Sequence, residues 1–128
     1  MRGLLLDVIN QEVKVVDVAN DIHEWYKMLN CQMVEMPERQ IGGKYFTIIC
    51  DEEGLLKSDP TIAAVNDRCE VMLVGNILIF NMDYEEGDIE DLTEDDIKHI
   101  QKYVQPMVVQ NKITGMLKKQ LMLTHVEY

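Results

Sequence analysis

The chain has 128 residues, the usual size of one domain, and 47% of them are hydrophobic, which is enough for a buried core. This composition excludes a wholly disordered chain, a collagen-like chain and a disulfide scaffold. Twelve basic residues against 23 acidic ones give a net charge of −11, which excludes a basic groove for direct nucleic-acid binding.

The apolar runs and the cysteines indicate a cytoplasmic protein. No apolar run approaches the roughly 20 residues of a membrane-spanning helix, so we expect no membrane contact. Three cysteines, Cys31, Cys50 and Cys69, include no C-x-x-C pair. This number and spacing fit neither a disulfide framework nor a zinc site, and they predict three buried, reduced thiols.

The N-terminal segment predicts a hairpin followed by a helix. Residues 3–10 and 13–18 are rich in Leu, Val and Ile and flank a turn at Asn10-Gln11. Asn20 is placed to cap a helix, because its side chain can accept hydrogen bonds from free amides at a helix start. The apolar face of that helix recurs at helical spacing and comprises Ile22, Trp25, Tyr26 and Leu29.

A second pair of strands is expected around the Gly42-Gly43 turn. Residues 31–36 alternate in polarity, and Pro37 places this strand at an edge or a bend. The two glycines predict a turn before a strand over residues 45–50, and the polar run 51–54 ends that strand.

The middle of the chain predicts a short helix and then a hairpin. Ser58-Asp59-Pro60 has the pattern of a helix start, with Ile62 and Val65 facing inward. Residues 71–80 form two continuously apolar runs around Gly75-Asn76. This arrangement predicts a two-residue hairpin at the centre of a sheet, with both of its faces covered.

The C-terminal part predicts two helical segments and a strand. Thr93, with Asp96 three positions later, forms an approximate capping box, and an apolar stripe follows it: Ile97, Ile100 and Val104. Pro106 is expected to end or kink this helix. A second helical segment is predicted from the spacing of Val109, Ile113, Met116 and Leu117, and residues 121–128 are expected to form a strand.

These elements together predict an α+β fold in one domain. We expect a mainly antiparallel sheet of five to six strands with three to four helices and a C-terminal helical extension. The α+β domain is assigned to residues 1–105, and the extension, packing on the domain or on a partner, to residues 106–128.

Residues 83–96 contain nine acidic residues among 14 and no basic one. A calcium loop is excluded, because with Asp83 as first ligand Gly87 falls at position 5 instead of the required 6. One interpretation is a solvated loop whose charges favour the amino end of the next helix. The other is an acidic docking surface for a basic partner, formed by Asp88, Glu90, Asp91, Glu94 and Asp95.

Candidate catalytic groups are sparse. The three histidines, His23, His99 and His125, are far apart in the sequence, and no protease or phosphate-binding glycine motif occurs. Asp96 and His99 are spaced to share a helix face, which leaves a metal-dependent hydrolase as a remote alternative to a surface pair. We therefore predict a protein that is not an enzyme and has no cofactor and no bound metal.

The Gly42-Gly43 turn is a second candidate site. Two glycines let a backbone approach a ligand closely, while Arg39 and Lys44 place positive charge beside them. Together with Tyr45, these residues could form a small anion or nucleotide pocket. The alternative is an ordinary hairpin turn with surface charges.

The C-terminal residues raise the possibility of a homodimer. Met107, Met116 and Met122 provide a soft apolar surface, although the alternative is that these methionines complete the core. Five lysines make this end positive, opposite in sign to the acidic stretch: Lys98, Lys102, Lys112, Lys118 and Lys119. Opposed patches on one chain favour self-association, most commonly with two-fold symmetry.

Several motifs occur in the order typical of a known family: Ile41-Gly42-Gly43, Asp51-Glu52-Glu53-Gly54-Leu55, Asp59-Pro60 to Ala64, and Val74-Gly75-Asn76-Ile77-Leu78-Ile79. Over roughly Met1 to Asp96 they resemble a small domain family of unknown function found in Firmicutes, their bacteriophages and their mobile elements. The resemblance implies a cytoplasmic α+β domain with no catalytic residues to carry over. Small proteins from such settings often block a host defence nuclease or sequester its nucleotide signal. We therefore predict an inhibitor that binds a protein partner through its acidic surface, with a nucleotide-binding sponge protein as the alternative.

Overall fold

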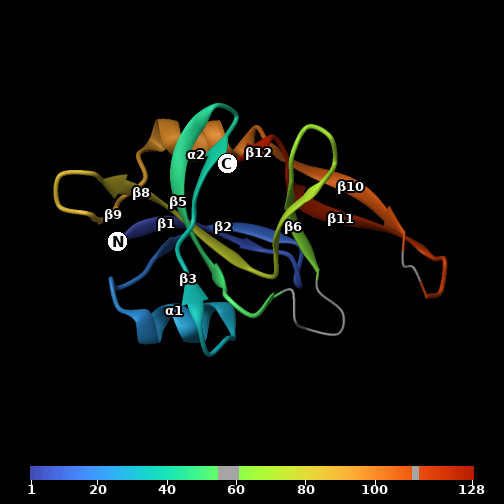
Figure 1. Cartoon of the computed structure of the whole chain (residues 1–128), viewed down its shortest axis with the longest axis horizontal. Helices are drawn as coiled ribbons and strands as arrows, with labels where there is room; N and C mark the ends of the chain where they lie inside the picture. Colours follow the sequence, from blue (N-terminus) through green and yellow to red (C-terminus); the bar gives the residue numbers. More distant parts are fainter. Residues whose placement is uncertain (55–60, 111–112) are drawn as a thin grey trace.

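A computed structural model describes residues 1–54, 61–110 and 113–128 (Figure 1). These residues form two helices, α1 (Ile22–Leu29) and α2 (Glu94–Gln101). Their strands are β1 (Arg2–Asp7), β2 (Glu12–Asp17), β3 (Val34–Glu35), β4 (Glu38–Ile41), β5 (Lys44–Asp51), β6 (Ile62–Val65), β7 (Val71–Val74), β8 (Ile77–Asp83), β9 (Asp88–Glu90), β10 (Val104–Gln110), β11 (Leu117–Leu123) and β12 (Val126–Glu127). The described part is therefore mostly β, and the predicted α+β fold with three to four helices is wrong.

The larger sheet has the strand order β12-β4-β5-β8-β1-β2, with β3 added on β5 and β9 on β8. Successive residues of its central strands enter two different apolar clusters. Ile48 and Ile79 belong to one cluster, whereas Ile49 and Leu78 belong to the other. Both faces of these strands are thus covered, which explains their nearly continuous apolar sequence and confirms that expectation for residues 77–80.

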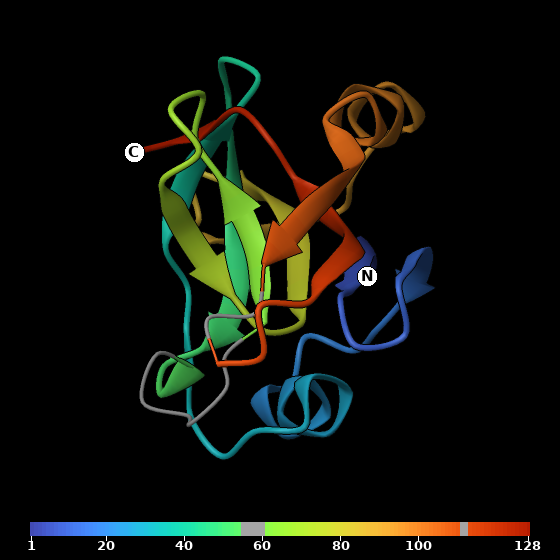
Figure 2. The same ribbon diagram turned by 90° about the vertical axis from the view of Figure 1, so that its right-hand side faces the viewer.

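The second sheet and α2 contribute to the cluster on one face of the larger sheet, and α1 contributes to the cluster on the other face. The second sheet has the order β10-β11-β6-β7, and it supplies Ala63 and Leu123 to the first cluster (Figure 2). Helix α1 buries Trp25 and Leu29 in the second cluster. Neither described helix is long and apolar enough to cross a membrane.

The turn at Gly75-Asn76 connects the two sheets and does not form the predicted hairpin. Strand β7 pairs with β6, whereas β8 pairs with β5 and β1. Gly75 has a φ of +75°, which lets the chain change direction between the sheets. A continuous apolar run indicates burial on both faces, but it does not indicate which strand will be the partner.

The predicted helix around Ile62 and Val65 is wrong, because both residues belong to strand β6. Its expected start, Ser58-Asp59-Pro60, lies outside the described residues. Ala63 and Ala64 are fully buried in the core, and β6 is hydrogen-bonded on both sides, to β7 and β11. Four apolar residues are compatible with either a helix or a strand, so the pairing with distant strands decides between them.

The described residues of the segment 106–128 do not form the predicted helical extension. Helix α2 ends at Gln101, and the chain continues as the antiparallel hairpin β10–β11, in which β11 also pairs with β6. The backbone N–H of Thr124 donates to the carbonyl of Tyr103 at 2.7 Å. Hydrogen-bonded and non-hydrogen-bonded pairs alternate along an antiparallel ladder, so Pro106 and Leu121 form a non-hydrogen-bonded pair, and the nitrogen of Pro106 points toward the open edge of β10. Proline is tolerated there because an edge position needs no ladder donor.

Several local predictions are confirmed. The first hairpin joins β1 to β2, and helix α1 follows, although its cap is Asp21 in place of Asn20. Gly42 and Gly43, with φ of +57° and +85°, form the turn between β4 and β5. By contrast, the prediction of three buried, reduced thiols is wrong in part: all three cysteines are reduced thiols and Cys50 is buried, but Cys31 is half-buried and Cys69 is exposed.

Candidate functional site

The acidic stretch 83–96 lies at one end of the molecule, where the hairpin β8–β9 leads into α2 (Figure 1). The pair Asp83–Asp88 closes the hairpin ladder. Ile89 and Leu92 are buried, and they fix the backbone between the acidic positions. The five predicted residues are all exposed, and we call them the acidic surface: Asp88, Glu90, Asp91, Glu94 and Asp95.

Three residues of the acidic surface are held by the chain itself. Both carboxylate oxygens of Asp88 accept from the side-chain amide of Asn20 at 3.1 Å. Asp91 accepts from the backbone N–H of Arg2 at 2.9 Å, and Glu94 forms an ion pair with the guanidinium of Arg2. The hydrogen bond and the charge of Arg2 lower the pKa of Glu94.

The remaining two carboxylates of the acidic surface are free toward solvent. Within the described ranges, the side chains of Glu90 and Asp95 make no hydrogen bond and no ion pair. Among the described residues, the ion pair between Arg2 and Glu94 is the only one that involves any of the five carboxylates. Most of the negative charge at this end is therefore not neutralised by the fold.

An open hollow of about 350 Å³ lies beside the acidic surface. Val15 and Val16 give it an apolar wall, and Asp17 and Asp91 give it negative charge. Met1 and Arg2 complete its lining, and the amino group of Met1 forms an ion pair with Asp17 at 2.8 Å. The hollow thus combines aliphatic and carboxylate groups along the edge strand β2.

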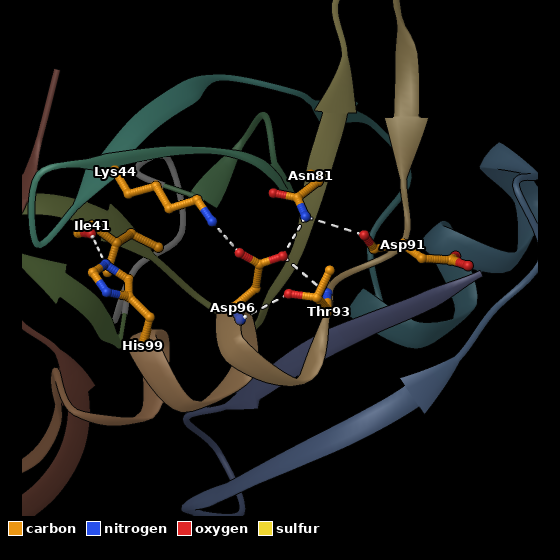
Figure 3. A network of polar contacts seen from close by, with 7 residues as sticks. All are labelled: Ile41, Lys44, Asn81, Asp91, Thr93, Asp96 and His99. Atoms are coloured by element: carbon orange, nitrogen blue, oxygen red, sulfur yellow. Dashed lines mark hydrogen bonds and ion pairs between the residues drawn. The ribbon is translucent and has the colours of Figure 1, made fainter.

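Asp96 is the one acidic residue of the stretch 83–96 that is buried, with 2% of its surface exposed. It forms an ion pair with Lys44 and accepts from the side-chain amide of Asn81 at 2.6 Å (Figure 3). The backbone N–H of Thr93 donates to Asp96 at 2.9 Å, and the Thr93 hydroxyl accepts from the Asp96 N–H at 3.1 Å. This is the predicted capping box, now connected to β5 and β8.

The pKa of Asp96 reflects two opposing effects. Burial by itself would raise this pKa, but the hydrogen bonds from Lys44, Thr93 and Asn81 outweigh burial and lower it. Asp96 is therefore ionised in the folded protein at neutral pH, and it joins the β4–β5 turn, β8 and the start of α2.

Asp96 and His99 are directed toward different partners. His99 Nε2 lies 2.7 Å from the carbonyl oxygen of Ile41, whereas Asp96 faces Lys44 and Asn81 (Figure 3). No group of three or more His, Cys, Asp or Glu side chains is placed to hold a metal ion in the described ranges. The structure thus does not bring these two residues together as metal ligands.

The two cationic side chains of the candidate pocket at Gly42-Gly43 contact other groups of the same chain. Lys44 pairs with Asp96, and the guanidinium of Arg39 lies 4.7 Å from the centre of the Tyr128 ring. The hydroxyl of Tyr45 accepts from the Gln40 amide at 3.1 Å. Lys44 is thus paired with a carboxylate, whereas Arg39 contacts the Tyr128 ring and the carbonyl of Glu38 and has no carboxylate partner among the described residues.

The space in front of Gly42 is filled by protein. A Cβ atom at Gly42 would overlap the ring of Tyr103, so this glycine allows close packing within the chain. At Gly43, by contrast, no described atom lies within 4 Å of a Cβ position. Gly42 is therefore a packing contact with Tyr103, whereas Gly43 is a position in an ordinary hairpin turn.

Sequence reasoning missed Arg2 and Asn81, and it assigned Asn20 to a helix cap; all three residues hold the acidic stretch in place. Asn81 directly follows the apolar run 77–80, and a polar residue at the end of a buried strand is a signal that could have been used. Arg2 is 92 positions from Glu94, and no local pattern in the sequence links the two.

The comparisons with known proteins identify a family and no individual relative. Neither the comparison with curated proteins nor that with solved structures found a match. A family model described as "Domain of unknown function (DUF3846)" matches residues 1–105. Because this match covers most of the 128 residues, the chain belongs to the DUF3846 family.

Proposed function

We propose that the protein is a non-enzymatic binding protein whose acidic surface docks a cationic protein partner. The observation that carries this proposal is that only one of the five exposed carboxylates, that of Glu94, forms an ion pair with a described residue. An uncompensated field of this kind attracts a basic partner and fixes its orientation.

The acidic surface is also preorganised. Ile89 and Leu92 are buried beneath it, and Asp96 links the start of α2 to β5 and β8. Because the backbone is already fixed, a partner would bind without a large loss of conformational entropy in this chain.

The hollow beside the acidic surface suits a long basic side chain. The aliphatic stem of a lysine or arginine would lie on Val15 and Val16, and its charged head would reach Asp17 or Asp91. We therefore propose a partner segment rich in Lys and Arg, as occurs on proteins that themselves bind nucleic acid.

The resemblance to proteins of bacteriophages and mobile elements supports a more specific version of the proposal. In that setting the partner would be a component of a bacterial defence system, and the protein would act in the cytoplasm as its inhibitor. Carboxylates that imitate a phosphate backbone would occupy the partner's basic site.

The nucleotide-sponge alternative has less support, because Lys44 and Arg39 already have partners within the chain. We expect no rise in the melting temperature when a cyclic dinucleotide is added. A rise that grows with ligand concentration would favour the sponge instead.

The test of the proposal uses fluorescent octalysine as a cationic probe and fluorescence anisotropy as the readout. In one variant the five carboxylates of the acidic surface become amides: Asp88→Asn, Glu90→Gln, Asp91→Asn, Glu94→Gln and Asp95→Asn. The control variant has the same net charge but changes exposed residues outside the acidic surface: Glu12→Gln, Glu24→Gln, Glu52→Gln, Glu53→Gln and Glu70→Gln.

We expect the first variant to bind octalysine at least roughly tenfold more weakly, because each exposed charge pair contributes about 0.2–1 kcal/mol. The control variant should lose much less affinity, and binding to the native protein should weaken as salt rises. Equal losses in the two variants would contradict the proposal, since binding would then follow net charge alone.

A further inference from the structure

The hairpin β10–β11 leaves the body of the protein at the end opposite the acidic surface (Figure 1). We call residues 105–110 and 117–121 of this hairpin the arm. Figure 2, viewed from this side, shows the hairpin in front of the remaining strands. Within the described residues, β10 pairs only with β11, so its outer edge and part of its surface face solvent.

One face of the arm is apolar and uncovered. Directly opposed residues of an antiparallel pair share a face, and Val108 opposes Lys119 while Gln110 opposes Leu117. Val108 and Leu117 therefore lie on the same face, where they are 61% and 69% exposed.

The same face is buried where the hairpin joins the body. Val104 and Leu123 are opposed there, and both contact the apolar cluster between the sheets. The apolar stripe thus begins in the core and continues outward to Val108 and Leu117. Such a stripe is typical of a surface that another molecule covers.

The edge of the arm is poorly suited to the addition of another strand. Pro106 is turned toward the open edge, as the hydrogen bond between Thr124 and Tyr103 indicates, and proline has no N–H to donate. Docking through the apolar face is therefore favoured over extension of the sheet.

The charge of the arm indicates what covers it. No acidic residue occurs between Val104 and Thr124, whereas the chain as a whole has a charge of −11. Lys119 lies on the apolar face itself, opposite Val108. The complementary surface for this face is therefore apolar and acidic.

This chain carries such groups at its other end, where Asp91 of the acidic surface lines the same hollow as Val15 and Val16. The arm and the hairpin β8–β9 lie at opposite ends of the longest axis of the molecule (Figure 1). Two copies placed side by side in opposite directions would bring each arm to the acidic surface of the other. The two contacts would be equivalent and related by a two-fold axis, which closes the assembly.

We propose that a second copy of this chain covers the arm. Val108 and Leu117 pack against the second copy, and the ammonium group of Lys119 faces its acidic surface. This inference rests on the proposed function, because it names one cationic ligand of the same acidic surface. An external basic partner would compete with the dimer for that surface.

Sedimentation velocity of the full chain at about 5–200 µM tests the proposal. We expect a dimer whose dissociation constant rises at least roughly tenfold in Lys119→Glu. Lys118→Glu is the matched control, because it has the same charge change on the opposite face of the arm, next to Val109. Its effect should be much smaller, and equal effects of the two variants would overturn the proposal.

A charge exchange makes the test independent of folding defects. By itself, Glu90→Lys/Asp95→Lys should dimerise at least roughly tenfold more weakly than the native protein, as Lys119→Glu should. An equimolar mixture of the two variants should dimerise, because every contact again joins opposite charges. A mixture that dimerises no more strongly than either variant alone would overturn the proposal.

The two proposals fail in different ways. A native protein that is monomeric at 200 µM, yet binds octalysine through the acidic surface, would overturn self-association only. Unchanged octalysine binding by the variant with five amides would overturn the proposed function, whatever the oligomeric state.

Discussion

Lys44 and Asp96 are 52 positions apart in the sequence and form an ion pair in which Asp96 is buried and Lys44 stays half-exposed. This pair joins the Gly42-Gly43 turn to the start of α2. It directs the charge of Lys44 toward the fold instead of toward a ligand, and it fixes the helix that carries part of the acidic surface.

Asp96→Asn should lower the free energy of unfolding by about 2 kcal/mol, since hydrogen bonds to a charged group typically contribute 1.5–3 kcal/mol. The amide would leave Lys44 without a carboxylate and would place an N–H₂ group among donors. Urea unfolding measures the change. Asp95→Asn, one position away and exposed, is the control and should change stability by less than about 0.5 kcal/mol.

The stability of the protein should fall in acid, partly through Asp96. Because the folded pKa of Asp96 lies below its unfolded value of about 3.9, this group stabilises the fold above pH 4, and the contribution is lost as pH falls toward the folded pKa. Urea midpoints at pH 7, 5 and 3 should fall mainly in the last step. If Asp96→Asn loses stability between pH 5 and pH 3 as steeply as the native protein does, carboxyl groups other than Asp96 cause the loss.

Gly42→Ala should destabilise the protein more than Gly43→Ala does. Both positions have positive φ, which disfavours a side chain by roughly 1–2 kcal/mol, but only at Gly42 would the new methyl group overlap Tyr103. That overlap should add about 1–3 kcal/mol. Thermal unfolding of the two variants compares the effects directly, and equal losses would mean that the Tyr103 ring moves aside freely.

Cys69 should react with a thiol reagent in the folded protein at pH 8, and Cys50 should not. Burial and the neighbouring carboxylate of Glu35 raise the pKa of Cys50 to about 12, so its reactive thiolate is scarce. Cys69 is exposed. Mass spectrometry after brief labelling distinguishes the sites, and Cys50 should react only after unfolding.

Local patterns predict the local parts of this fold. The hairpin β1–β2, the helix over Ile22–Leu29 and the capping box of Thr93 each depend on residues that are close in sequence. The exposure of the acidic surface follows from composition in the same way, because clustered carboxylates stay hydrated.

Long-range pairing explains what sequence patterns could not predict. The spacing of Val109 and Leu117 is compatible with a helix, yet β11 pairs with β6, which precedes it by more than fifty positions. The apolar runs β7 and β8 belong to different sheets, so they do not pair with each other. The partners Arg2 and Lys44 of the acidic stretch are likewise distant in sequence.

The most direct test of the central claim is a backbone amide NMR map of the native protein during titration with octalysine. If the acidic surface is the docking site, the largest shift changes will lie in residues 83–95 and around the hollow at Val15. Changes spread evenly over the exposed acidic residues, including Glu24 and Glu52, would contradict the claim.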